Sequence, residues 1–169
     1  MKRDELRAIQ TPLKERYKDE PEAAVITLAA SGRLGENVSC SVDTGRALSE
    51  AGLHPASGGD GSQLCSGDML LEALVACAGV TLQAVATSLG IEVESGTVRA
   101  EGELDFRGTL AVDHDAPVGF RSIRLDFDLD TDAGEEELAT LLKLTERYCV
   151  VLQTLSNPPE LSAVLTTNS

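Results

Sequence analysis

The longest apolar stretch of the chain, residues 68–89, predicts a buried helix. Beyond Asp68 its one charged residue is Glu72, and Gly90 follows it as a common stop signal for a helix. Residues at helical spacing form one broad apolar face: Met69, Leu70, Ala73, Leu74, Cys77, Val80, Thr81, Ala84 and Val85. Small residues at positions 76, 78 and 79 leave room for a second element to come close. Polar positions such as Gln83 argue against a membrane span.

Two later stretches, residues 91–106 and 118–130, alternate apolar and polar positions. The alternation is clearest at Ile123, Leu125, Phe127 and Leu129. A period of two predicts strands that are exposed on one side. We expect the two strands to pair through the connection at residues 108–117.

The pattern before the long helix is weaker. Spacings of three and four predict an amphipathic helix within residues 1–20, bent near Pro12, through Leu6, Ile9, Leu13 and Tyr17. Residues 23–30 and 37–42 predict the strands of a β-hairpin, with the turn at 31–35. Residues 43–67 are rich in Gly, Ser and Pro, which predicts a loop.

The C-terminal part predicts a further helix and a last strand. Three glutamates after Gly134 mark the start of the helix, because acids are favoured at a helix N-terminus, and Cys149 lies where we expect it to break. Apolar residues at 150–155 lead to two prolines, after which residues 161–167 predict a strand. Strand pairs separated from long helices indicate an α+β fold, with antiparallel sheets around the central helix. We expect one domain over residues 1–169, with an N-terminal helix in 1–20 and the core in 23–167.

The acidic excess of the chain limits its partners. The sequence has 28 acidic against 14 basic residues, which gives a formal charge of −14. Such a charge repels the phosphate backbone of nucleic acids and anionic membrane surfaces, so we expect neither as a partner. The first residues are polar rather than apolar, so no secretory signal is predicted, and the cytoplasm is the expected compartment.

The cysteines favour redox chemistry over metal binding. The chain has four: Cys40, Cys65, Cys77 and Cys149. No two of them form a Cys-x-x-Cys pair, and His54 and His114 lack ligand spacing, so no metal site is expected. Both histidines also fall in loop-like sequence, which disfavours a Cys–His nucleophile pair.

Cys77 allows two interpretations. It lies in the middle of the apolar helix, where a small core hydrophobe is the simplest explanation. Cys149 also has apolar neighbours in a helical context. If the fold brings the two together, they can form a reversible disulfide, as required of a thiol that peroxide oxidises and a reductant regenerates.

Two segments resemble a known family. Residues 68–77 (DMLLEALVAC) look like the central helix of the osmotically induced protein C and organic hydroperoxide resistance family (OsmC/Ohr), and residues 147–155 (RYCVVLQTL) are similar to its second cysteine segment. Order, separation and strand pattern also agree over residues 23–167. The resemblance implies an intertwined α+β homodimer in which each active site draws on both subunits.

The resemblance also implies a thiol-dependent peroxidase that reduces organic hydroperoxides, and hydrogen peroxide as a further substrate. Cys77 would attack the peroxide and become a sulfenic acid, and Cys149 would condense with it to a disulfide. An external dithiol, lipoyl-like or thioredoxin-like, would reopen that disulfide. No cofactor or metal is implied.

An activating cation is part of the same resemblance. A cysteine thiol with its usual pKa of about 8.5 is mostly protonated at neutral pH, and the family supplies an arginine held by a carboxylate. Arg33 is the first match for the arginine and Arg46 the second. Asp68 stands where the family usually has Glu, with Glu72 one turn on, and Asp68 also suits the N-cap of the helix. Nine residues separate it from Cys77, which is ~13 Å along a helix.

Two other functions stay open. The altered carboxylate is compatible with a non-catalytic module that binds a hydrophobic small molecule in the dimer cleft. A structural dimer with inert core cysteines is the third interpretation. Cys40 and Cys65 match neither family cysteine, and we expect them to be packing or incidental thiols.

Overall fold

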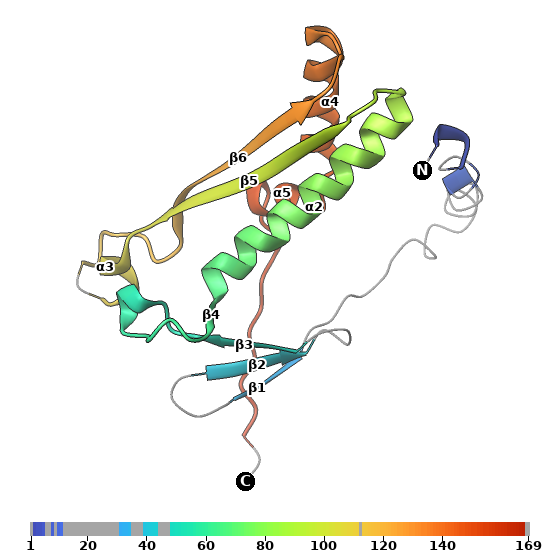
Figure 1. Ribbon diagram of the computed structural model, residues 1–169. Coiled ribbons are helices and arrows are strands. Elements are labelled where there is room, and N and C mark those ends of the chain that lie inside the picture. The colour runs from blue at the N-terminus through green and yellow to red at the C-terminus, as the bar shows by residue number, and fades with distance from the viewer. Residues whose placement is uncertain are drawn as a thin grey trace.

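The structure is a computed structural model that describes residues 2–5, 8, 10–11, 31–34, 39–43, 48–111 and 113–167, with the backbone alone at 31–34, 39–43 and 48–49. Figure 1 shows one long helix lying along a two-stranded sheet, with two further helices beside it. A second, small sheet completes the α+β architecture that the sequence predicts. Helical backbone at residues 3–5, 8, 10 and 11 agrees with the predicted N-terminal helix, and residues 12–20 lie outside the described part.

The long helix and the sheet beside it match the predicted elements. Helix α2 (Ser66–Leu89) ends at Gly90, whose φ of 79° is left-handed, as the stop signal requires. Strands β5 (Ser95–Leu104) and β6 (Phe120–Asp130) pair antiparallel, each slightly shorter than predicted. A short helix, α3 (Phe106–Thr109), lies in their connection.

The core lies between α2, the inner face of this sheet and the C-terminal helices. Every fourth residue of α2 is buried, which makes a single stripe: Leu74, Ala78, Leu82 and Ala86. Alternate residues of the two strands pack against it: Val98, Ala100, Ile123, Leu125, Phe127 and Leu129. The strand faces therefore follow the predicted alternation.

The buried face of α2 is narrower than predicted. Leu70 and Val80, both assigned to the apolar face, are 36% and 73% exposed, because no described element of this chain covers that side. By length and apolar composition α2 would also qualify as a membrane span, yet it packs on β5, α4 and α5. Its apolar composition thus serves a core on one side and an open apolar face on the other.

Two helices follow the sheet. Helix α4 (Glu135–Tyr148) begins with three acids, and the Glu137 side chain accepts a 3.0 Å hydrogen bond from the Gly134 backbone N–H. Helix α5 (Val150–Ser156) follows after a single residue, Cys149, whose extended backbone (φ −73°, ψ 105°) separates the two helices. The predicted break at this cysteine is therefore present.

The small sheet corrects two predictions. Residues 31–34, predicted as a turn, form strand β1 (Ser31–Leu34), which pairs antiparallel with β2 (Ser39–Asp43). The predicted loop at 43–67 contains β3 (Leu48–Gly52), a 3-10 helix η2 (Pro55–Ser57) and β4 (Leu64–Cys65). Pairing between strands outweighs the local preference of Gly and Ser for loops here. The predicted strand at 23–30 lies outside the described residues.

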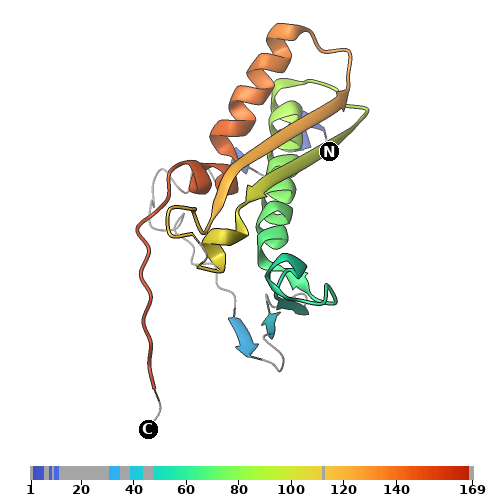
Figure 2. The ribbon, with the colours of Figure 1, turned by 90° about the vertical axis from the view of Figure 1, so that its left-hand side faces the viewer.

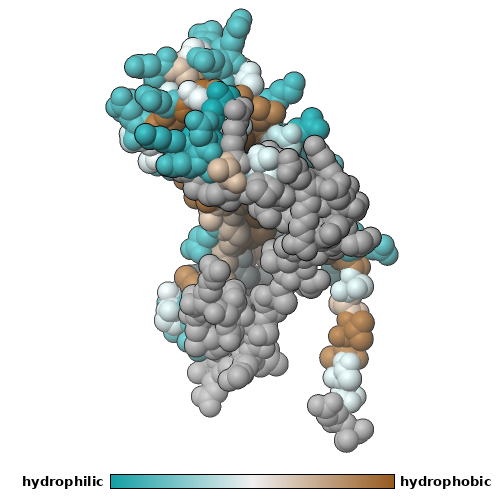
Figure 3. All heavy atoms as spheres, turned by 90° about the vertical axis from the view of Figure 1, so that its right-hand side faces the viewer, coloured by the Kyte–Doolittle hydropathy of each residue, from teal (hydrophilic) through white to brown (hydrophobic). Residues whose placement is uncertain are grey.

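The C-terminal segment is the third correction. Residues 161–167, predicted as a strand, have no regular structure and pair with no described strand. Figures 1 and 2 show this segment running away from the body of the protein, and Figure 3 shows apolar side chains on it. Leu161, Val164 and Leu165 are 83%, 89% and 91% exposed. Because this segment pairs with no described strand, its local pattern alone does not make it a strand.

Candidate active site

The fold brings Cys77 and Cys149 together. Cys77 lies on α2 and is partly buried, and Cys149 joins α4 to α5 and is fully buried. Cys149 belongs to the core cluster with Leu74 and Ala78, and Cys77 packs against that cluster. Both are free thiols, and each shifts the pKa of the other.

Hydrogen bonds fix the corner at Cys149. Its backbone N–H closes α4 by donating to the Thr145 carbonyl at 2.9 Å, and its carbonyl opens α5 by accepting from the Gln153 N–H at 2.9 Å. The Gln153 side chain reaches back and donates to the Glu146 carbonyl at 2.8 Å, which satisfies one of the open carbonyls at the end of α4. These bonds hold the corner between α4 and α5 in place.

The N–H groups at the start of α5 affect the pKa of Cys77. No side chain caps α5. Partial burial raises the pKa of the Cys77 thiol, but hydrogen bonds from the Val151 N–H, the Cys149 thiol, the Thr81 hydroxyl and the Val150 N–H together lower that pKa below its usual value. Donors stabilise a sulfur anion because they place partial positive charge against it. Cys77 is therefore the sulfur that ionises first.

Cys149 shifts the other way. Burial raises the pKa of its thiol, and although the Leu152 and Val151 N–H groups oppose this, the hydrogen bond and the charge of Cys77 raise it further. A second thiolate beside the first is disfavoured, because like charges repel at short range. The pair thus divides into one nucleophile and one protonated neighbour.

The predicted cation lies outside the described side chains. Arg33 lies on β1 opposite Ser41, and its side chain is outside the described part, as is the whole of Arg46. In the part whose side chains are described, the groups that lower the pKa of Cys77 are hydrogen-bond donors rather than cations. Arg33 and Arg46 therefore stay predictions.

Asp68 lies away from the two sulfurs, in the first turn of α2. It is exposed and lines a cavity of about 560 Å³ at that end of the helix, and the N-cap position is held by Cys65 instead. Glu72, its alternative, is also exposed. Nine residues of helix place Asp68 ~13 Å from Cys77 along the axis. The structure thus does not bring this carboxylate to the thiols.

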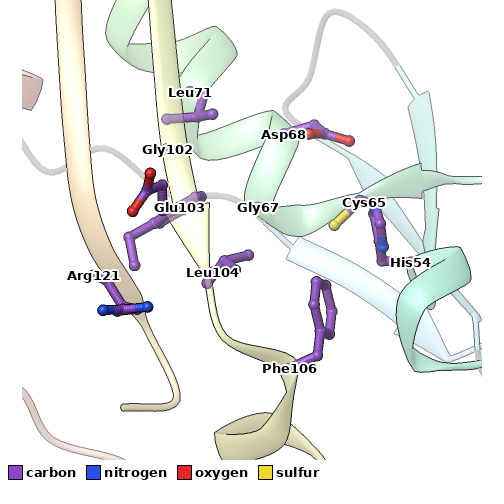
Figure 4. Close-up of a pocket in the computed structure, with 11 residues that line it drawn as sticks. His54, Cys65, Gly67, Asp68, Leu71, Gly102, Glu103, Leu104, Phe106 and Arg121 are labelled. Carbon is purple, nitrogen blue, oxygen red and sulfur yellow. The ribbon is translucent and has the colours of Figure 1, made fainter. Parts of the chain in front are cut away.

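The cavity beside Asp68 holds a third thiol. Figure 4 shows Cys65 next to His54, with Phe106 near them and Arg121 and Glu103 on the opposite side. His54 stacks on Phe106 with ring centroids 5.1 Å apart, and its Nδ1 accepts from the Ala56 N–H at 3.0 Å. Among the described residues no three His, Cys, Asp or Glu side chains group as metal ligands.

An apolar groove of about 660 Å³ adjoins Cys77 through Thr81. It runs between α2 and α4, and its lining includes Val80, Thr81, Ala84, Val85, Leu144 and Tyr148. Thr81 both borders the groove and lowers the pKa of the Cys77 thiol through its hydroxyl. The thiol therefore lies next to a surface that suits an apolar molecule.

The sequence did not predict four contributors to this site: Thr81, Gln153 and the N–H groups of Val150 and Val151. The contact of Thr81 with Cys77 could have been predicted, because Thr81 lies four residues after Cys77 and therefore on the same face of the helix. The other contributors depend on the angle between α4 and α5, for which the sequence gives no signal.

Comparisons with known proteins bear on the family and the fold of the chain. A sequence profile of the family described as OsmC-like protein matches residues 59–163. A search among curated proteins gave no match. Among solved structures, an OsmC-like protein from Mycoplasma pneumoniae is similar with a TM-score of 0.67 at 17% identity, covering 79% of this chain and 89% of that one.

Two similar structures carry a functional name. An organic hydroperoxide resistance protein OsmC from Legionella pneumophila has a TM-score of 0.62 at 18% identity, over 79% of this chain and 92% of that one. An organic hydroperoxide resistance protein from Elizabethkingia anophelis has a TM-score of 0.61 at 19% identity, over 79% and 91%. At these identities the likeness is one of fold.

Proposed function

Because the chain belongs to the OsmC-like protein family, we propose that it is a cysteine-based peroxidase that reduces organic hydroperoxides through Cys77 and Cys149. The observation that carries this proposal is the contact between two free thiols whose pKa values are shifted in opposite directions. The relatives named for hydroperoxide resistance support the choice of substrate.

The first step uses Cys77 as a thiolate. Its sulfur attacks the terminal oxygen of the hydroperoxide, the O–O bond breaks, and the organic part leaves as an alkoxide that takes a proton to become an alcohol. Cys77 is oxidised by two electrons to a sulfenic acid. The donors that stabilise the thiolate at rest raise the fraction available for attack at neutral pH.

The second step uses Cys149 as the resolving thiol. Its sulfur attacks the sulfenic sulfur, the S–O bond breaks, and water leaves as the disulfide forms. Because Cys77 already packs against the core cluster that contains Cys149, we expect this step to need little movement of the chain. An external dithiol then returns two electrons and two protons and restores both thiols.

The apolar groove beside Thr81 favours an organic substrate over hydrogen peroxide. Apolar walls gain from contact with an alkyl or aryl group, whereas hydrogen peroxide has none to offer. The same groove also supports the alternative of a non-catalytic module for a hydrophobic small molecule. That alternative predicts thiols inert to peroxide and a bound apolar ligand in native mass spectrometry.

We also propose a homodimer. The open side of α2 and the exposed apolar residues near the C-terminus are surfaces that a second copy would cover. Light scattering coupled to size-exclusion chromatography tests this directly. A dimer would also allow Arg33, held by Asp68, to act across the subunit boundary.

The test of the function has two readouts. Purified protein with dithiothreitol should consume cumene hydroperoxide catalytically, and one equivalent of peroxide without reductant should give a Cys77–Cys149 disulfide in a non-reducing peptide map. Absence of both consumption and disulfide would reject the peroxidase and leave the binding module as the better account.

A further inference from the structure

Thr81 differs from most threonines in the described helices. The hydroxyls of Thr87, Thr140 and Thr154 each donate to the carbonyl four residues earlier, at 2.8, 2.9 and 2.8 Å. This is the usual bond for a threonine inside a helix. Thr81 makes no such carbonyl bond among the described residues, its hydroxyl lowers the pKa of the Cys77 thiol, and it lies one helical turn from that thiol.

Helix geometry explains this choice of partner. Positions 77 and 81 lie one above the other on the same face of α2, so the two side chains are neighbours. The χ1 angle of threonine has few preferred values, so a hydroxyl that faces the sulfur is held there rather than sampling many directions. Thr81 also borders the groove, which places its hydroxyl between the groove and the thiol.

From this placement we infer that Thr81 is a positioning residue: its hydroxyl donates to the Cys77 thiolate and orients that sulfur toward the N–H groups of α5 and toward Cys149. The inference rests on the proposed function for its biological meaning, but its physical content concerns the thiolate alone. By this inference a side chain of α2 helps to stabilise the Cys77 thiolate, whether or not Arg33 also does so.

The direction of the effect follows from charge. A hydroxyl hydrogen bond is stronger to a thiolate than to a thiol, so its loss raises the pKa of Cys77. A rise of about one pKa unit lowers the thiolate fraction at pH 7 roughly tenfold. The rate at high pH should not fall, because a more basic thiolate is at least as nucleophilic.

The experiment compares Thr81→Val, Thr81→Ser and Thr87→Val. Alkylation of Cys77 by iodoacetamide is followed by peptide mass spectrometry from pH 5 to 10 in the full chain. We expect the pH midpoint to rise by about one unit in Thr81→Val, which is nearly isosteric, and to return with the hydroxyl of Thr81→Ser. The Thr87 hydroxyl donates to a carbonyl on the same helix, so Thr87→Val should leave the midpoint unchanged.

Each outcome separates this inference from the proposed function. An unchanged midpoint in Thr81→Val would overturn the role of Thr81 while leaving the peroxidase intact. A raised midpoint in a protein inert to hydroperoxide would support Thr81 and reject the peroxidase. If Thr81→Val does not fold, Thr81→Ala replaces it, and a midpoint in that variant equal to the parent's overturns the inference equally.

Discussion

The two cysteines with described side chains at α2 lie in opposite settings. Cys65, at the N-terminal end, lines a cavity with an imidazole and charged side chains but has no second sulfur among its described neighbours. Cys77, near the middle, has few polar side chains near it, yet it meets another thiol and several hydrogen-bond donors. The difference teaches that an abundance of titratable groups does not make a redox site. Here a partner sulfur and aligned donors do.

The largest expected difference between the two regions is in catalysis. Cys77→Ser should lower the turnover of cumene hydroperoxide by at least about 10³-fold, because it removes the nucleophile. Cys65→Ser should leave turnover unchanged. Peroxide consumption in the presence of dithiothreitol measures both. Loss of activity in the Cys65 variant alone would mean that Cys65, and not Cys77, is the nucleophile.

Replacement of Cys149 should separate the two chemical steps. Cys149→Ser keeps the thiolate of Cys77, so the first equivalent of peroxide should still react, but no disulfide can form inside the chain. Repeated exposure should then convert Cys77 to sulfinic acid, because resolution is missing. Intact-mass spectra after one and after several equivalents distinguish these products. Sustained turnover with dithiothreitol at the parent's rate would show that Cys149 is dispensable.

Packing should also differ between the two regions. Leu74 is fully buried beside Cys149, so Leu74→Ala should lower the free energy of unfolding by about 2–5 kcal/mol. Leu71, one turn from Asp68, faces the N-terminal cavity and is only partly buried, so Leu71→Ala should cost about 1 kcal/mol. Urea unfolding measures both. Equal losses would mean that the two ends of the core are equally well packed.

The smallest expected effects concern the arginine and its carboxylate. If the guanidinium of Arg33 reaches Cys77, Arg33→Gln should raise the pKa of that thiol by about one unit, near the low end for a charge partner. Asp68→Asn acts only through the arginine and should therefore change the pKa of Cys77 less than Arg33→Gln does. Arg46→Gln serves as the matched control. A larger shift in the Arg46 variant would exchange the roles of the two arginines.

Periodicity predicted the long elements that bury one face. The stripe at Leu74 and Ala78 and the alternation through Ile123 and Leu125 come from burial against neighbours close in the fold, and α2, β5, β6 and α4 follow them. Residues 31–34 form a strand because they pair with β2, and four residues are too few to show a periodicity that would predict it. The pattern at residues 161–167 predicts a strand but cannot supply its partner.

The site, like the fold, could be predicted only in part. The family resemblance pointed to Cys77 and Cys149, and the fold joins them. The donors from Val150 and Val151 could not be predicted, because they depend on a one-residue break between two helices that the sequence locates but does not orient. Asp68 shows the converse, since a matching position in the motif lies far along the helix from the thiols.

The pH titration of both thiols tests the central claim most directly. Alkylation resolved by peptide should show Cys77 reacting with a midpoint below the usual value of about 8.5, because its donors favour the thiolate, and Cys149 with a midpoint above it, because burial and the neighbouring charge favour the thiol. Reactivity at pH 7 should therefore belong to Cys77 and rise with pH through its midpoint. A midpoint for Cys77 at or above the usual value, or equal midpoints for both sulfurs, would contradict the account.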